Sequence, residues 1–197
     1  ADVLNPYRTA SDGLAWRAEY ERRYGQYKGI RQPELTRANL RVEIYPGRRE
    51  AEIRGTFHLV NTSPDAIDSV HLATKSAVNT MAVRFDRPAK NVLSDEEFGH
   101  RIYALETPLR PGESLQLNFE VHFKPRGFPN RGMDASVVAN CTYFTNDAWL
   151  PAIGYQEDRE LRSAGDRRKY RLAARPETPM LDDVEARRDS GGADRIA

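Results

Sequence analysis

Residues 115–123 read Leu-Gln-Leu-Asn-Phe-Glu-Val-His-Phe, so apolar and polar side chains alternate along the whole stretch. Successive side chains of a β-strand point to opposite faces of a sheet, so this alternation predicts a strand with one buried and one solvent-facing side. Such half-buried strands are typical of antiparallel sheets. The stretch therefore predicts an antiparallel sheet as the framework of the chain.

The same alternation continues on the N-terminal side of this strand. Leu40, Val42 and Ile44 share one face of a first strand, and a turn at Pro46-Gly47 leads into a second strand over residues 51–59. Shorter strands are expected at residues 70–72, 81–85, 102–105 and 137–143, whereas the polar residues 86–99 predict a loop. Several short strands with short connections predict an all-β fold, an antiparallel β-sandwich with a short N-terminal helix and an irregular C-terminal extension.

The N-terminal helix is predicted by an aromatic stripe. Trp16, Tyr20, Tyr24 and Tyr27 follow one another at steps of four, four and three residues, which places them on one helix face, and Ser11 is the expected N-cap. Such stripes usually pack against the rest of a domain, and we expect that role here. The alternative is a helix that lies on a membrane surface or docks a partner.

The sequence divides into three expected regions. Residues 1–33 form the helix and a linker, residues 34–175 form the sandwich domain, and residues 176–197 form an extended or disordered tail toward a missing peptidase domain. The charged segment 159–172 could hold a short helix. Both ends of the sequence are expected to be boundaries of a piece cut from a larger protein.

Composition disfavours several classes of function. The chain has 30 Lys and Arg residues against 29 Asp and Glu residues, and a net charge of +1 offers no field for nucleic acid, so no nucleic-acid partner is expected. Its single cysteine, Cys141, excludes an intramolecular disulfide and a cysteine-based zinc site, and we expect it to be a small, semi-buried residue.

No catalytic motif is present in the sequence. It contains no HExxH, GxSxG, P-loop or GxGxxG pattern, which argues against an independent hydrolase. The alternation places His58, His71 and His122 on the polar faces of strands. The imidazoles of His58 and His122 could meet if their strands paired, but a zinc site would need a third ligand, and no metal site is expected.

Several segments together indicate a family. Residues 34–46 read Glu-Leu-Thr-Arg-Ala-Asn-Leu-Arg-Val-Glu-Ile-Tyr-Pro and lead into Ile-Arg-Gly-Thr-Phe-His-Leu-Val-Asn at 53–61. This order resembles the opening strands of the N-terminal, saddle-shaped β-sandwich domain of aminopeptidase N-like zinc metallopeptidases. Residues 143–146, 149–156 and 159–161 more closely resemble the peptidase-like region fused to bacterial ABC-type permeases. The resemblance covers roughly residues 5–183, and it departs at position 141, where Gly would be expected and Cys is found.

The resemblance implies a non-catalytic accessory domain of a membrane-anchored protein. The catalytic HExxH motif and the zinc ion would belong to a missing downstream domain, so neither catalytic residues nor a cofactor are expected in this fragment. The implied partners are that downstream domain of the same chain, upstream transmembrane segments and a peptide substrate. The implied location is the extracytoplasmic (periplasmic) face of a bacterial membrane protein. Asn146 matches the position that helps to hold the free amine of the substrate.

A second hypothesis remains open. The chain could be a stand-alone β-sandwich module that binds a peptide or a sugar. Such a module needs an exposed aromatic platform, for which Tyr45, Tyr103 and Trp149 are the candidates, or an unpaired edge strand.

Overall fold

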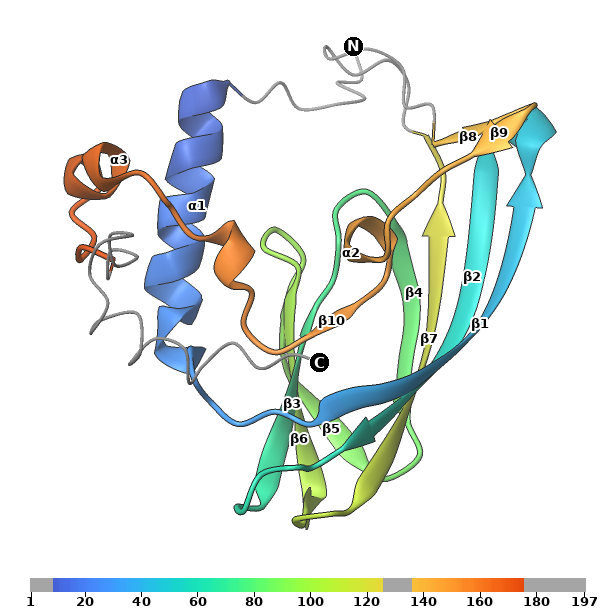
Figure 1. The fold of residues 1–197 in the computed structure, drawn as a ribbon, viewed down its shortest axis with the longest axis horizontal. Helices are drawn as coiled ribbons and strands as arrows, with labels where there is room; N and C mark the ends of the chain where they lie inside the picture. The colour runs from blue at the N-terminus through green and yellow to red at the C-terminus, as the bar shows by residue number, and fades with distance from the viewer. Residues whose placement is uncertain (1–8, 126–135, 176–197) are drawn as a thin grey trace, which may run out of the picture. The chain divides into compact units, whose positions relative to one another are not determined.

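The computed structural model describes residues 9–125 and 136–175, and it confirms an all-β antiparallel sandwich (Figure 1). The first four-stranded sheet has the order β1 (Glu34–Tyr45), β2 (Glu50–Val60), β7 (Ser114–Phe123) and β4 (Asn79–Phe85). The second has the order β10 (Ala152–Ile153), β3 (Ile67–Ala73), β6 (His100–Leu109) and β5 (Ala89–Asp95). A separate pair consists of β8 (Val137–Val138) and β9 (Cys141–Thr142). The predicted tail 176–197 lies outside the described residues.

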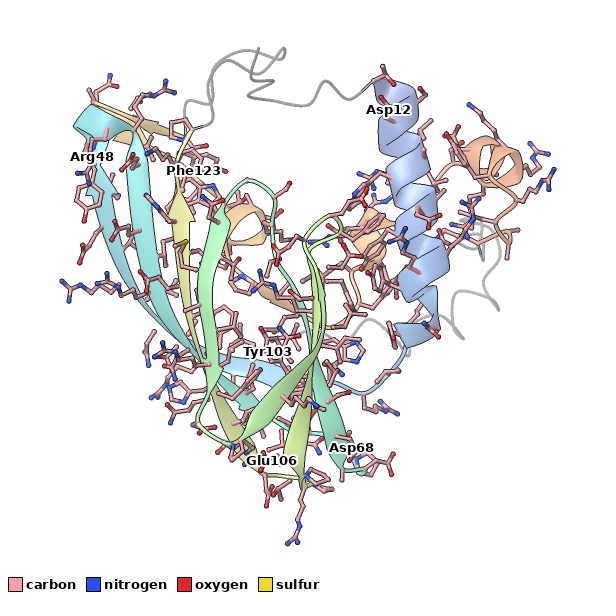
Figure 2. All side chains as sticks on the ribbon, turned by 180° about the vertical axis from the view of Figure 1, so that it is seen from behind. Asp12, Arg48, Asp68, Tyr103, Glu106 and Phe123 are labelled. Carbon is pink, nitrogen blue, oxygen red and sulfur yellow. The ribbon has the colours of Figure 1, made fainter. Side chains whose placement is uncertain are left out.

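The core lies between the two sheets, where the alternating residues of β7 meet those of the second sheet. All five apolar residues of the 115–123 stretch are buried, as their alternation predicts. Phe119 packs on Phe57 of β2 with ring centroids 4.6 Å apart, and Phe85 meets Tyr103 edge-on at 5.1 Å across the sandwich. Figure 2 labels Tyr103 between the sheets. Burial of these rings is the main favourable term that holds the two layers together.

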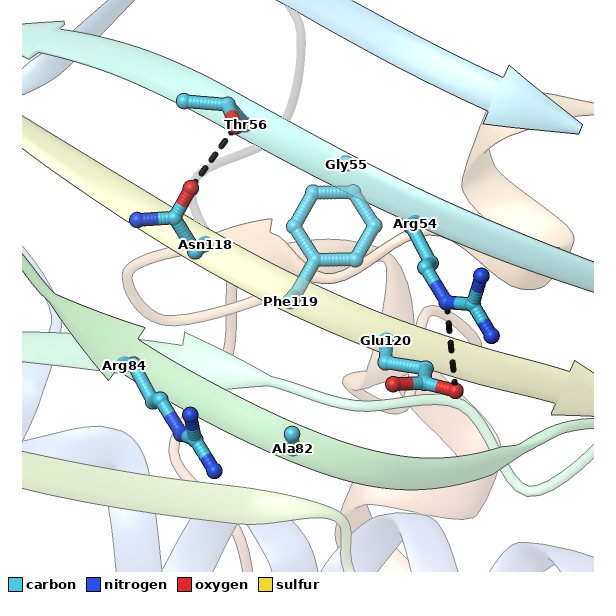
Figure 3. Close-up of a pocket in the computed structure, with 8 residues that line it drawn as sticks. All are labelled: Arg54, Gly55, Thr56, Ala82, Arg84, Asn118, Phe119 and Glu120. Carbon is cyan, nitrogen blue, oxygen red and sulfur yellow. Dashed lines mark hydrogen bonds and ion pairs between the residues drawn. The ribbon is translucent and has the colours of Figure 1, made fainter.

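Gly55 of β2 makes room for one of these rings. It pairs with Phe119 of β7, and Figure 3 shows the Phe119 ring lying over it. We expect Gly55→Ala to lower the free energy of unfolding by about 2 kcal/mol, because the new methyl group would overlap a buried ring that Phe57 holds in place. Urea denaturation measures the change. Gly47→Ala is the matched control, since a methyl group there meets nothing within 4 Å; equal stability of both variants would contradict the expectation.

Asn61 closes the turn after β2. Its side chain is fully buried, and its amide nitrogen donates to the carbonyl oxygens of Asp65 and Leu109, both at 2.8 Å. Its Oδ1 accepts from the backbone N–H of Ser63 at 3.0 Å, as in an Asx turn. Residues 61–65 therefore form a turn, and its first side chain links the end of β2 to the end of β6.

The aromatic stripe docks α1 (Ala10–Tyr24) and the following one-turn helix η1 (Gly25–Tyr27) onto the second sheet. Tyr20, Tyr24 and Phe98 form a buried cluster that Trp16 and Tyr27 flank. This confirms the packing role predicted for the stripe. The predicted N-cap was wrong: Thr9 caps the helix, because its hydroxyl accepts the Asp12 N–H while the Asp12 carboxylate accepts the Thr9 N–H in return.

The loop predicted over residues 86–99 was wrong in its middle, where β5 pairs with β6. β5 is an edge strand with four exposed residues and a register shift between Asn91 and Leu93, so it carries no clean alternation. Its strand conformation follows from pairing with β6 rather than from its own pattern.

The chain forms two compact units, Ala1–Glu160 and Leu161–Ala197. The boundaries expected from the sequence after residues 33 and 175 stay predictions. The first unit also contains η2 (Pro46–Arg48), α2 (Asn146–Trp149) and η3 (Glu157–Arg159). The second contains α3 (Ala164–Lys169), the short helix expected in this region, which the Ser163 hydroxyl caps by accepting the Asp166 N–H. No helix among the described residues is long and apolar enough to cross a bilayer.

Candidate functional site

Asn146, the predicted substrate-binding residue, opens the one-turn helix α2 and is exposed. The turn is anchored by Trp149, whose ring stacks on Phe123 at 4.4 Å and on Phe144 at 4.1 Å. The Asn146 carbonyl oxygen accepts the Leu150 N–H at 2.9 Å, so its backbone closes the turn, and its side-chain amide has no hydrogen-bond partner among residues 9–125 and 136–175. The structure thus holds Asn146 at the surface on a rigidly packed support.

Asp147 stands next to it and is also exposed. A hydrogen bond from Thr145 holds the pKa of the Asp147 carboxyl below its usual value, so this group is ionised at neutral pH. Sequence reasoning missed Asp147, although a carboxylate is a stronger partner for an ammonium group than an amide is.

An open hollow of about 830 Å³ lies beside α2. The polar hollow, as we call it, is bordered by α1, the β3–β4 connection, the β5–β6 turn, α2 and η3. Its lining includes Trp16, Lys75, Glu96, Arg101, Ala148 and Arg159. Ala148 belongs to the same turn as Asn146, so the predicted residue sits on an element that walls the hollow.

The cations of the polar hollow differ in their pairing. Arg159 is buried and donates to the carbonyl oxygens of Phe98 at 2.6 Å and Thr74 at 2.9 Å. Arg101 donates to Glu96 at 2.9 Å. Lys75 has no hydrogen-bond or ion-pair partner among the described residues, and burial, with some help from the nearby Arg159 charge, lowers the pKa of its amine. An acidic or carbonyl-rich ligand would find one unpaired cation here.

Two histidines of the second sheet are covered by α1 and η1. His100 is fully buried, and its ring stacks on Tyr24 at 4.3 Å and on Tyr27 at 5.8 Å. His71 meets the Tyr27 ring edge-on at 4.8 Å and lies 5.5 Å from His100. The prediction that His71 faces solvent was wrong: it is 3% exposed because the helix covers its strand. This histidine pair packs the helix onto the sheet.

Burial and neighbouring charges perturb several pKa values around this pair. Burial, with repulsion from His71 and Arg159, lowers the pKa of His100 to about 4, so its ring is neutral at pH 7. Neither ring nitrogen of His100 has a hydrogen-bond partner among the residues that the structure describes. Burial and a hydrogen bond to Asp95 raise the pKa of Tyr24, which keeps its hydroxyl protonated and donating. The His100 ring and the Tyr24 hydroxyl are therefore uncharged at neutral pH, and the cluster anchors the helix to the sheet.

The described residues contain no group of three His, Cys, Asp or Glu side chains that could hold a metal ion. The strands of His58 and His122 do pair, but His58 stands opposite Gln116 and His122 opposite Glu52, so the imidazoles do not meet. Cys141 is exposed, which contradicts the predicted semi-buried position; it lies in the two-residue strand β9, outside the two four-stranded sheets.

A shallower hollow of about 310 Å³ lies on the outer face of β2, β7 and β4 (Figure 3). Its polar side chains are largely occupied with one another: Thr56 donates to Asn118 at 2.7 Å, and Arg54 lies 3.6 Å from Glu120. Arg84 is the one polar side chain of this lining that has no such partner among the described residues and could contact a ligand.

The three candidate residues do not form the exposed aromatic platform that the binding-module hypothesis requires. Tyr103 is 7% exposed and Trp149 is 2% exposed, because both rings fill the core. Tyr45 is covered on one face by Arg48, whose guanidinium lies 4.3 Å from the ring centroid. The unpaired edge strand named as the other requirement is present, since β1 ends its sheet.

Comparison with known proteins gives a structural likeness only. No family model matches the chain, and no curated protein sequence matches it. Solved structures that resemble it include the M1 zinc metallopeptidase from Deinococcus radiodurans, with 18% identity over 49% of this chain and 21% of that one and a TM-score of 0.38. A mutant of that enzyme bound to a Tyr-Ser-Ala substrate has the same identity and TM-score over 49% of this chain and 22% of that one. This chain therefore spans less than a quarter of the length of these structures.

Proposed function

We propose that this chain is the non-catalytic N-terminal accessory domain of a membrane-anchored aminopeptidase N-like metallopeptidase, and that it packs on the zinc domain and shapes its substrate cleft. The observation that carries the proposal is the polar hollow beside α2. This hollow is open and could form one side of a substrate cleft, while the described residues of the sandwich hold no metal-binding group. The residue pattern of the opening strands and of segment 143–156 supports the family. Fold alone does not give function, so the site must be tested directly.

The proposal assigns the zinc chemistry to a downstream domain, since no set of described side chains fits a zinc ion. In that arrangement zinc would polarise the scissile carbonyl. The part of this chain is to hold the peptide. Asn146 Oδ1 accepts a hydrogen bond from the free amine of the substrate, and the Asp147 carboxylate adds a negative charge beside it. The proposed surroundings are the extracytoplasmic face of the membrane, with transmembrane segments upstream.

Asn146→Ala, made in the longer protein that the proposal requires, is expected to raise KM about tenfold with a smaller change in kcat. The reason is the loss of one hydrogen bond to a charged group that is made before the reaction and kept through it. Steady-state hydrolysis of aminoacyl p-nitroanilides measures both constants. Asn91→Ala, at an exposed position on β5, is the matched control. An unchanged KM in the Asn146 variant would remove this residue from the substrate site.

A simpler observation tests the function itself. The gene should encode apolar spans upstream of this segment and an HExxH motif downstream, and finding neither would defeat the proposal. The purified chain with added zinc is expected to show no aminopeptidase turnover. Turnover that disappears when the chain is unfolded and returns on refolding would instead favour an independent hydrolase.

The stand-alone binding module remains the second candidate because one observation favours it, the free edge of β1. Peptide and glycan arrays probed with the purified chain separate the two readings. Tight binding to one sequence or one sugar would favour the module.

A further inference from the structure

Strand β1 is long, lies at a sheet edge and is exposed. It spans Glu34–Tyr45, and β2 is its only ladder partner in the part of the chain that the structure describes. Within the described residues no backbone hydrogen bond reaches its outer edge. A row of free N–H and C=O groups of this length is a template for another strand.

The inner face of β1 is apolar along its whole length. Leu40, Val42 and Ile44 stand opposite Gly55, Ile53 and Ala51, whose side of β2 faces the core. A bulge between Leu35 and Arg37 turns Leu35 to the same face, opposite the buried Leu59. Yet these β1 residues stay exposed, at 48% for Leu35, 40% for Leu40, 39% for Val42 and 41% for Ile44. The strip lacks the inward-pointing charge that protects many edge strands from pairing.

We propose that β1 pairs with β1 of a second copy of this chain, antiparallel about a two-fold axis that passes beside Leu40. The two first sheets then form one continuous sheet across the dimer. Leu40 faces its own copy, Ala38 faces Val42, and Arg37 faces Glu43 on the outer side. Each charge pair occurs twice because the interface is symmetric.

Like charges disfavour the two registers nearest to this one. Centring the pairing on Asn39 places Arg37 against Arg41, and centring it on Arg41 places that residue against itself; like charges directly opposite each other destabilise a ladder. Centring it on Val42 places Arg41 against Glu43, which already pair within the strand at 2.8 Å. That register leaves Arg37 outside the ladder of regular residues, so Arg37 distinguishes the two attractive registers.

A second copy fits this edge better than an unrelated strand, because β1 is its own complement. The Leu40-centred register joins residues 37–43, the regular part of the strand beyond the bulge, with apolar pairs inside and opposite charges outside. An edge-to-edge contact buries less surface than a standard interface, so the expected association lies in the micromolar range.

The experiment is sedimentation of the purified chain from about 1 μM to about 200 μM, a range that spans the expected affinity. A concentration-dependent monomer–dimer equilibrium is the expected result. Amide hydrogen exchange should slow at high concentration in residues 37–43 and stay unchanged in β5, the edge strand of the other sheet. A chain that stays monomeric over the whole range overturns the proposal.

Charge exchange tests the register. Arg37→Glu places two carboxylates opposite each other on each side of the axis and is expected to weaken association about tenfold. Glu43→Arg should weaken it similarly, and the double variant should restore most of the loss. The Glu43 change also removes its contacts with Arg41 and Tyr45, but the single and double variants share that loss, so it cancels in the cycle.

Two further variants sharpen the outcome. Leu40→Lys places two ammonium groups at the axis and is expected to abolish the dimer, while its exposed position spares the monomer, as thermal unfolding would check. Lys90→Glu is the control, a charge reversal at an exposed position on β5. Association that both Leu40→Lys and Arg37→Glu leave unchanged, or that Lys90→Glu weakens as much as they do, rejects β1 as the interface. A dimer that Arg37→Glu leaves intact but Leu40→Lys abolishes rejects the Leu40-centred register.

Discussion

Replacing Arg159 with Met is expected to lower the free energy of unfolding by about 3 kcal/mol. The guanidinium is buried and donates to the carbonyl oxygens of Phe98 and Thr74, and it lies over the Tyr20 ring at 5.6 Å. Methionine fills a similar volume but leaves both carbonyl groups without these donors in a place that water reaches poorly. Burial lowers the pKa of Arg159, so part of the loss is offset by relief of desolvation.

Urea denaturation of the wild type and the variant measures this loss. Arg162→Met is the matched control, because Arg162 is exposed and has no hydrogen-bond or ion-pair partner among the described residues, and its change should cost little. Arg159→Lys should recover only part of the stability, since one ammonium group cannot reproduce two divergent N–H bonds. If the Arg159 and Arg162 variants were equally stable, the buried guanidinium would not hold η3 to the sheets.

Acid is expected to destabilise the fold through His100, by about 3 kcal/mol once the pH has fallen from 6.5 to 4. Its pKa is about 4 in the folded chain against a usual 6.5. Above pH 6.5 the ring is neutral in both states, so it adds no pH dependence. Below pH 6.5 the imidazole binds a proton in the unfolded chain but not in the folded chain, and the free energy of unfolding therefore falls until about pH 4. Burial lowers the pKa of His71 as well, which acts in the same direction.

His100→Phe separates this effect from other acid effects. A phenyl ring keeps the stacking on Tyr24 and Tyr27 but has no nitrogen to protonate or to leave unpartnered. The variant is expected to be at least as stable as the wild type at pH 7 and to lose much of the slope between pH 6.5 and 4. Protonation of Asp95 affects stability only at a lower pH, because the pKa of its carboxyl is below the usual 3.8. An unchanged slope would contradict the assignment to His100.

The sequence predicted the strands that carry a strict alternation and missed the parts whose structure depends on a neighbour. β2 and β7 pack between other strands, so burial of one face left a period of two in their residues. β5 lies at an edge with an irregular register, so its sequence does not alternate between apolar and polar residues. β1 shows the opposite error, because its alternation is clean and yet its apolar face is not buried.

The candidate site was predictable only in part. Asn146 was identified by the resemblance of its segment, and the structure holds it at the surface on α2. Lys75, Arg159 and the buried histidines gave no signal, because their roles arise where α1 and η3 meet the second sheet. His71 was placed on the solvent side of its strand by alternation alone, whereas η1 covers that side. Packing between distant segments decides such positions.

The buried side chain of Asn61 also limits how the protein can be prepared. Asn61-Thr62-Ser63 matches the acceptor pattern for N-linked glycosylation. Oligosaccharide addition in a eukaryotic secretory host meets the chain before it folds, and a glycosylated amide could not enter the enclosed space between Asp65 and Leu109. Secretion from yeast or animal cells would thus trap molecules carrying this sugar outside the native state, whereas bacterial expression avoids the obstacle.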